Sequence, residues 1–259
     1  MTPATKSIFG RELDRLLPQV SSRLGLCVFA ILLANATWAL AEPAHDHGPR
    51  QYPAEMNQRF ASPETDVQEF VKRFENDQRD VYVKRHEIVR AMGLRPGDRV
   101  ADIGAGTGLF TLLFAKEVGQ QGQVYAVDIS EAFLKHIANQ AKNRGQQRIV
   151  RTILNSQDSA GLPPSSVDVA FLCNTYHHFD HPEKMLASLY RALRRGGRLV
   201  VIDFDLRPDS SEFVKKRARA PKETYFREIV AAGFRPVSRK DLPAIKDNFF
   251  AEFERVESR

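Results

Sequence analysis

The chain has little cysteine: only Cys27 and Cys173 occur in its 259 residues. Two cysteines exclude a disulfide framework within one mature domain, and they exclude a metal or arsenic site built from several thiolates. Internal repeats are absent too, as is a basic groove interleaved with aromatic side chains on which bases could stack. These absences argue against a disulfide-rich domain and against nucleic acid as a partner.

Charge of one sign is not concentrated along most of the chain. The formal net charge is +6 and the isoelectric point is near 9.4, yet Lys and Arg are scattered among Asp and Glu. This pattern predicts a solvated surface of mixed charge rather than an anionic partner. Residues 215–219 form the one basic cluster, in a predicted loop. With 42% hydrophobic residues, the chain is long enough for one substantial α/β domain and an extension.

The N-terminal segment has the pattern of a secretory signal. Arg11, Arg15 and Arg23 precede an apolar stretch at 24–40, and small residues at positions 39 and 41 suit a signal peptidase. The stretch is short for a bilayer span and contains polar residues, so we expect cleavage after Ala41 rather than a permanent anchor. An uncleaved anchor stays open. Either outcome places the globular part outside the cytoplasm, as a periplasmic or secreted protein.

A linker at 42–62 and a helical cap at 63–93 are expected next. The linker is rich in Pro, His and Gly; its pair His45 and His47 could bind a metal, but a solvated tail is the preferred interpretation, and no metal is predicted. Ser62 is the expected N-cap of the cap helix, whose apolar face at 67–74 is interrupted by the polar run 75–80 before Gly93 ends it.

Strands and helices alternate from residue 94 to the C-terminus. The expected strands are 99–103, 123–128, 148–154, 167–173, 198–204, 234–238 and 248–256. The expected helices between them are 109–118, 131–144, 183–193 and 222–232. This alternation requires crossover connections and therefore a parallel sheet covered on both faces. The last two strands follow each other without a helix, which predicts a hairpin and one antiparallel strand.

Residues 100–110 (VADIGAGTGLF) place three alternate glycines where a buried strand turns into a helix. Gly104, Gly106 and Gly108 permit positive φ and close approach of the backbone to a ligand, and the next helix presents free N–H groups. A dinucleotide-binding fingerprint would have its third glycine one residue later, where Leu109 stands. The spacing therefore favours another nucleotide-like ligand and disfavours a nicotinamide-dependent oxidoreductase.

The region 94–256 resembles the class I S-adenosylmethionine (SAM)-dependent methyltransferases. The glycine run is similar to their first motif, VYAVD at 124–128 to their second, and QDSAGLP at 157–163 to the motif after their third strand. NTYHHF at 174–179 resembles a stretch of ubiquinone-type and other small-molecule methyltransferases. The resemblance implies a Rossmann-like, seven-stranded, mostly parallel sheet with an antiparallel C-terminal hairpin, here with an N-terminal helical extension, and a methyltransferase domain at 94–259.

The resemblance also implies which residues bind the cofactor, SAM. Asp128 ends the second strand twenty residues after Gly108 and would accept hydrogen bonds from both ribose hydroxyls. Asp158 would accept from the adenine amino group, and Asp102 would lie near the amino end of the cofactor. The full expected set is Asp102, Gly104, Ala105, Gly106, Gly108, Asp128, Ile129, Asp158, Ser159 and Asn174.

Three neighbouring residues, Tyr176, His177 and His178, are the candidates for catalysis. They follow the fourth strand, at the carboxyl edge where open α/β folds bind ligands. An imidazole could take a proton from a hydroxyl or an acidic carbon of a small-molecule acceptor. The expected activity is thus methyl transfer from SAM to a small molecule. The alternative is an exported sensor or scaffold that binds SAM without catalysis. We keep it because SAM is made in the cytoplasm, and the sequence shows no source of SAM for an exported enzyme.

Overall fold

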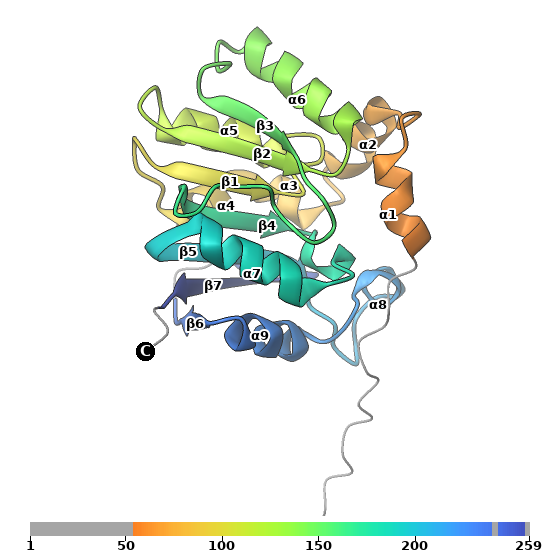
Figure 1. Cartoon of the computed structure of the whole chain (residues 1–259). Helices are drawn as coiled ribbons and strands as arrows, with labels where there is room; N and C mark the ends of the chain where they lie inside the picture. Colours follow the sequence, from red (N-terminus) through yellow and green to blue (C-terminus); the bar gives the residue numbers. More distant parts are fainter. Residues whose placement is uncertain (1–53, 240–242, 257–259) are drawn as a thin grey trace, which may run out of the picture. The chain divides into compact units, whose positions relative to one another are not determined.

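The computed structural model describes residues 54–239 and 243–256, and a single seven-stranded sheet organises them. The strands lie in the order β3-β2-β1-β4-β5-β7-β6 (Figure 1). Their bounds are β1 Arg99–Ile103, β2 Gln123–Asp128, β3 Val150–Leu154, β4 Val167–Cys173, β5 Leu193–Phe204, β6 Phe234–Val237 and β7 Asn248–Arg255. Strands β1 to β5 pair in parallel, while β7 is antiparallel to β5 and β6. The predicted fold class and C-terminal hairpin are confirmed.

Helices precede the sheet and connect most of its strands along the chain. Their bounds are α1 Ala54–Ala61, α2 Val67–Phe74, α3 Asp80–Val83, α4 Arg85–Met92, α5 Leu109–Val118, α6 Glu131–Asn143, α7 Pro182–Ala192, α8 Glu212–Arg217 and α9 Lys222–Ala231, with a 3-10 turn at Tyr176–His178. The basic cluster predicted in a loop falls partly on α8, so that assignment is wrong for residues 215–217.

Alternate residues of the central strands bury opposite faces of the sheet. Val100, Phe171 and Val200 pack with α4, α5 and α6 on one face. Their neighbours Ala101, Leu172 and Val201 pack with α7 and α9 on the other. Strands covered on both faces need continuous apolar sequence, which is what these strands have. Both layers of helices therefore hold the carboxyl ends of β1, β4 and β5 in fixed register.

Strand β5 begins at Leu193, five positions before the predicted start, and is irregular near its amino end. Val167 pairs with Leu193 while Val169 pairs with Arg198, so the register shifts between them. The irregularity contains Gly196 and Gly197, which resemble a break between helix and strand when the sequence is taken alone. The other predicted elements after residue 94 agree with the structure within about two residues.

The cap differs from its prediction at its start. Helix α1 lies within the segment expected to be a linker. Helix α2 is capped by Asp66, whose side chain accepts hydrogen bonds from the N–H groups of Gln68 and Glu69; Ser62 instead accepts from Glu64 in a turn. The expected interruption after α2 and the end at Gly93, with φ +56°, are confirmed.

Other expectations for the N-terminus lie outside the described residues. They are the signal segment at 1–41, the pair His45 and His47, and the linker up to residue 53. Within the described ranges, no helix is long and apolar enough to cross a membrane.

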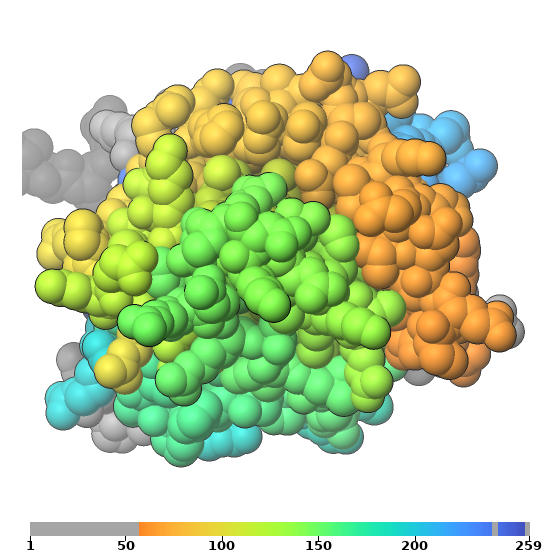
Figure 2. All heavy atoms as spheres, turned by 90° about the horizontal axis from the view of Figure 1, so that it is seen from above, coloured from red at the N-terminus to blue at the C-terminus, as the bar shows by residue number. Residues whose placement is uncertain are grey.

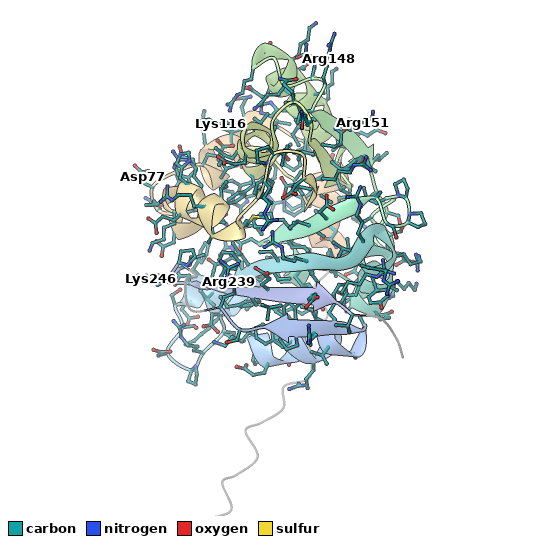
Figure 3. All side chains as sticks on the ribbon, turned by 90° about the vertical axis from the view of Figure 1, so that its left-hand side faces the viewer. Asp77, Lys116, Arg148, Arg151, Arg239 and Lys246 are labelled. Carbon is teal, nitrogen blue, oxygen red and sulfur yellow. The ribbon has the colours of Figure 1, made fainter. Side chains whose placement is uncertain are left out.

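Charged side chains extend from several separate elements of the described surface. Figure 3 labels Asp77 in the cap, Lys116 on α5, and Arg148 and Arg151 at the β3 edge, and all four are exposed. Their dispersal agrees with the mixed surface predicted from the sequence.

The burial pattern gives a matched pair of substitutions that tests the core. Leu172 in β4 is fully buried and Leu154 in β3 is 53% exposed. We expect Leu172→Ala to lower the free energy of unfolding by about 2–5 kcal/mol, because it opens a cavity between two packed layers. Leu154→Ala, the same chemical change, should cost less than about 1 kcal/mol. Urea unfolding measures both, and equal losses would contradict the assignment of β4 to the core.

Candidate active site

The turn between β1 and α5 contains the three glycines of the sequence motif. Gly104, Gly106 and Gly108 have φ of +67°, +53° and +84°, backbone conformations that residues other than glycine rarely adopt. A β-carbon at Gly104 would collide with the side chain of Thr175, and one at Gly108 would lie 2.7 Å from a carbon of Ile137. A β-carbon at Gly106 would meet no atom closer than 3.9 Å. Gly106 therefore borders open space, while the other two glycines let neighbouring elements approach.

That open space is part of a cavity of about 790 Å³ at the carboxyl ends of β1, β2, β4 and β5. The volume is within the range of pockets that enclose small molecules. The cap and α8 contribute its other walls. The residues that were predicted for the site and line the cavity are Asp102, Gly104, Ala105, Gly106, Asp128, Ile129, Asn174, His177 and His178.

Asp128 connects the second strand to the glycine turn. Its Oδ2 accepts a hydrogen bond from the N–H of Gly106 at 2.7 Å, and its Oδ1 accepts from Ser130 at 2.9 Å. Burial raises its pKa to about 6, although the backbone N–H groups of Gly106, Ser130 and Ile129 act in the opposite direction. Each carboxylate oxygen keeps a second lone pair with which to accept a ligand hydroxyl. The residue is therefore suited to the ribose contact that the sequence predicts.

Asp102 is a second buried carboxylate, at the end of β1. Its Oδ2 accepts a hydrogen bond from the hydroxyl of Thr111 at 2.6 Å. Burial raises its pKa to about 7; the bond from Thr111 opposes that shift, and the nearby charge of Asp128 adds to it. With this pKa, the Asp102 carboxyl is partly protonated near pH 7. A positively charged or hydrogen-bond-donating ligand in the cavity would favour its ionised form.

Some predicted residues lie elsewhere. Gly108 is the N-cap of α5 and, like Asp158 and Ser159, is not among the described residues that line the cavity. Asp158 pairs with Lys184 at 2.9 Å, and the hydroxyl of Ser159 lies 3.2 Å from that of Ser188. Gln157, one residue earlier, lines the cavity where the sequence places an adenine contact.

Tyr176 points away from the cavity. Its side chain is fully buried, and its hydroxyl donates to Glu228 on α9 at 2.9 Å. Burial, together with the charge of Glu228, raises the pKa of its phenol. The structure thus places Tyr176 in the core behind the 3-10 turn, where it anchors that turn, and does not bring it to the predicted catalytic position.

His177 faces the cavity and pairs with a residue that sequence reasoning missed. Its Nδ1 lies 2.7 Å from Oδ1 of Asp203, and its backbone N–H donates to the other oxygen at 3.2 Å. Both side chains are buried, with 3% and 0% of their surface exposed. The carboxylate fixes the ring orientation, and it would stabilise a proton gained at Nε2. A signal was available, because Asp203 is a lone charge in the apolar run LVVIDF at 199–204.

His178 packs against aromatic rings. Its ring centroid is 5.4 Å from that of Phe60 and 4.1 Å from that of His177. Burial, reinforced by the neighbouring His177, lowers its pKa to about 2. His178 therefore stays neutral near physiological pH and is the poorer of the two histidines for taking up a proton.

Aromatic residues of the cap form a wall of the cavity. Phe60 and Phe74 line it together with Phe133 of α6, and Phe70 packs behind them with its centroid 5.4 Å from that of Phe133. In the space-filling view the orange cap lies directly against the green atoms of the α6 region (Figure 2). Asn57 fastens α1 to the 3-10 turn by donating to the carbonyl of His178 at 2.9 Å.

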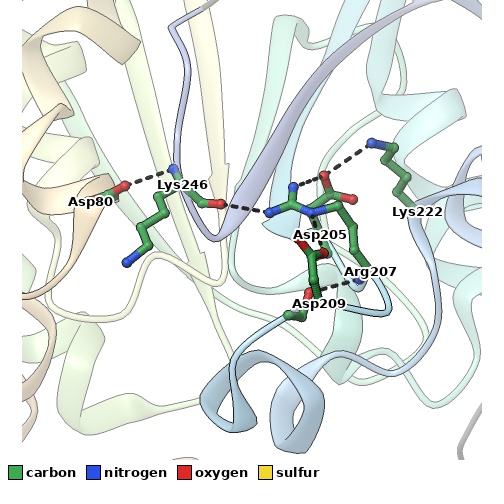
Figure 4. Close-up of polar contacts among 7 residues, drawn as sticks. Asp80, Asp205, Arg207, Asp209, Lys222 and Lys246 are labelled. Carbon is green, nitrogen blue, oxygen red and sulfur yellow. Dashed lines mark hydrogen bonds and ion pairs between the residues drawn. The ribbon is translucent and has the colours of Figure 1, made fainter.

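A polar network joins the opposite side of the cap to the C-terminal half. Asp80, at the start of α3, accepts a hydrogen bond from the backbone N–H of Lys246 at 2.8 Å (Figure 4). The Lys246 carbonyl accepts from Arg207, which pairs with Asp205 at 2.8 Å, and Lys222 of α9 reaches the same carboxylate at 3.1 Å. The cap is thus attached at both ends of the cavity.

The arrangement favours a nucleotide-like ligand bound along β1 and β2, beside a second molecule that contacts His177. Within the described ranges, no group of three or more His, Cys, Asp or Glu side chains is placed to hold a metal ion. The fold and site together define a Rossmann-like, ligand-binding α/β protein of the doubly wound type.

Comparison with known proteins narrows this class. Residues 101–199 match the family model described as "Methyltransferase domain". The ubiquinone/menaquinone biosynthesis C-methyltransferase UbiE of Marinomonas sp. (strain MWYL1) is 35% identical over 127 residues, which cover 49% of this chain and 50% of that protein. UbiE of Ectopseudomonas mendocina (strain ymp) is 34% identical over 116 residues, 45% of each chain. The chain thus matches about half the length of these curated relatives.

Solved structures agree on the fold. A SAM-dependent methyltransferase from Aquifex aeolicus superposes with a TM-score of 0.61 at 23% identity, covering 74% of this chain and 99% of that one. Geranyl diphosphate C-methyltransferase from Streptomyces coelicolor A3(2) gives a TM-score of 0.57 at 15% identity, covering 67% and 76%. The motifs, the family model over residues 101–199 and these similarities together support a class I SAM-dependent methyltransferase.

The buried carboxylate at the end of β1 leads to a testable pH dependence. Because the folded-state pKa of Asp102 lies above its unfolded value near 4, its contribution to stability is full below pH 4 and is lost as the pH rises through about 7. We expect Asp102→Asn, whose amide oxygen can still accept from Thr111, to raise the melting temperature of the ligand-free protein increasingly from pH 5 to pH 8. Each kcal/mol corresponds to about 2–4 °C in a chain of this size.

The same variant is expected to bind S-adenosylhomocysteine (SAH) more weakly, because it removes a carboxylate from the cavity lining. The exposed Asp77→Asn is the matched control, with no pH-dependent gain in melting temperature expected. Differential scanning fluorimetry across this pH range makes the measurement. A constant offset for Asp102→Asn at every pH would contradict the shifted pKa.

Proposed function

We propose that this protein transfers the methyl group of SAM to a small-molecule acceptor, with His177 as the general base. The observation that carries the proposal is the buried His177–Asp203 pair, whose histidine lines the same cavity as the glycine turn. The proposed cofactor site and the proposed proton acceptor thus border one cavity. An acidic carbon or a hydroxyl is the proposed acceptor atom. The names of the curated relatives, which are C-methyltransferases, favour carbon.

Residues of the first two strands would hold the cofactor. Asp128 would accept from the ribose hydroxyls, Gly104 and Gly106 would lie under the methionine moiety, and Asp102 would face its amino end. Two observations support this fit. A β-carbon at Gly106 would project into open space, and the N–H of the same glycine holds the carboxylate of Asp128 beside that space. Bound there, SAM supplies an electrophilic methyl carbon on a sulfonium, so positioning and exclusion of water are the main demands on the protein.

The dyad would supply the proton chemistry. Asp203 holds Nδ1 of His177, and Nε2 is the nitrogen that would remove a proton from the acceptor as the new bond forms. The carboxylate compensates the positive charge that then develops on the ring. The aromatic wall of Phe60, Phe74 and Phe133 would keep water from the reacting atoms.

Substitution of the dyad tests the assignment. We expect His177→Ala to reduce methyl transfer by about 10²–10⁴-fold and Asp203→Asn to reduce it strongly too, because both remove the oriented base. SAH affinity should change little in either variant. The assay follows label from methyl-labelled SAM into products of a bacterial small-molecule extract. The exposed His86→Ala is the control, with activity retained.

Two results would count against this function. Full activity in both His177→Ala and His178→Ala would remove the proposed base. Tight SAH binding without any labelled product would favour the alternative of a protein that binds SAM and does not catalyse.

We also propose export of the globular part, on the sequence pattern at 11–41 alone. Signal cleavage would give a mature N-terminus at Glu42, and an uncleaved segment would anchor the protein to the membrane. Peptide mass mapping of the native protein in fractionated cells tests this, with a periplasmic or secreted chain starting at Glu42 expected. An intact N-terminus in the cytoplasmic fraction would refute it.

A further inference from the structure

Arg79, just before α3 in the cap, is a half-buried cation that neither the cofactor cradle nor the dyad uses. It lines the cavity, with its guanidinium carbon 5.4 Å from the ring centroid of Phe74. Burial, together with repulsion from Arg217 and Arg73, lowers its pKa, and the nearby Cys173 thiol only partly opposes this. No carboxylate in the described ranges forms an ion pair with it. A guanidinium withdrawn from water without a counter-ion is costly and calls for a bound anion.

Two further cations reach the same end of the cavity from α8. Lys216 and Arg217 line it, and the Arg217 guanidinium stacks over the ring of Phe213 at 3.8 Å. Among the described residues, the carboxylate of Asp247 lines this end, and the nearby Asp203 is engaged by His177. Counted over the described lining residues alone, cations outnumber carboxylates here, and Arg79 and Arg217 repel each other.

This end is separate from the proposed cofactor cradle. Asp128, Ile129 and the glycine turn lie over β1 and β2. Arg79 lies close enough to Cys173, at the end of β4, to interact with it electrostatically. Lys216 and Arg217 belong to α8, the helix that follows β5 in the chain. Since β4 and β5 lie on the far side of β1 from β2, the cations border the part of the cavity that contains His177.

The same end carries apolar surface. Phe204 packs on His177 with ring centroids 5.1 Å apart, and Phe213 packs edge-on against Phe204 at 5.7 Å. Phe213 is 42% exposed, although it is large and apolar. A ligand that covers it would remove apolar area from water.

From these contacts we propose that the methyl acceptor is an organic acid, with a carboxylate or phosphate bound by Arg79, Lys216 and Arg217 and an apolar body packed on Phe204 and Phe213. The inference rests on the proposed function, because it assigns the second molecule of the same cavity. Charge-assisted hydrogen bonds to the guanidinium would orient the apolar body toward His177. The acid group thus acts as a handle and takes no part in methyl transfer.

Binding of probe molecules tests this without turnover. The full chain is saturated with SAH, and calorimetry then measures affinity for 2-naphthoate, 2-naphthyl phosphate and the neutral 2-naphthamide. We expect at least one acid to bind about tenfold more tightly than the amide, a preference set by charge and not by the shared ring. The stronger acid distinguishes a carboxylate handle from a phosphate handle.

Variants then assign the preference to its residue. Arg79→Gln should reduce it to about twofold or less, with Arg79→Lys intermediate, while SAH affinity stays unchanged. Lys72→Gln, which removes an exposed cation from the same cap outside the cavity lining, should leave the preference intact. Retained SAH binding also shows that each variant folds.

Three outcomes would overturn the proposal. They are equal binding of acids and amide to the unmodified chain, an acid preference unchanged in Arg79→Gln, and loss of SAH binding in Arg79→Gln, which would assign the guanidinium to the carboxylate of the cofactor. Failure of the unmodified chain to bind SAH would instead refute the proposed function itself.

Discussion

The parallel pairing of β4 with both β1 and β5 is the constraint on which the rest of the molecule depends. Parallel strands bring their carboxyl ends to one edge, so the glycine turn after β1 and the 3-10 turn after β4 meet there. Asp203 reaches the same edge because Ile202, its neighbour, pairs with Cys173. Burial of both faces fixes this register, since a slip of one residue would turn Phe171 and Leu172 to the wrong layers.

The sequence predicted the sheet well because the signals for it are local. Apolar runs, the glycine turn and the hairpin at the end each lie within a few consecutive residues, and the carboxylates at 102 and 128 follow from their place beside them. A contact between side chains from different strands, such as that of His177 with Asp203, has no such local signal. Asp203 lies 26 residues beyond His177 and meets it only through the pairing of β4 with β5. Tyr176 and His177 are neighbours in the sequence, but consecutive residues of the 3-10 turn point in different directions. The side chain of Tyr176 therefore lies in the core, while that of His177 borders the cavity.

The cap also shows what the sequence alone could not predict. Its apolar stripe predicted a helix that packs on the domain, but the stripe could not indicate that α1 would form in the linker, or that Phe60 and Phe74 would border a cavity. The ion pair of Asp158 with Lys184 is a further contact that motif spacing did not indicate. A motif fixes where the chain turns, whereas the ion pair with Lys184 on α7 is set by how that helix packs.

The attachments of the cap have a consequence for the order in which the molecule assembles. Asp80 is held by the backbone of Lys246, and the carbonyls of Ala91 and Met92 accept from Arg239 and Arg198. The cap precedes β1 in the chain, whereas all of these anchors follow β4, and Arg239 and Lys246 also follow β5. A nascent chain can thus form the cradle over β1 and β2 while its roof stays open. The cap therefore gains its last anchor only after the sheet up to β5 has been made.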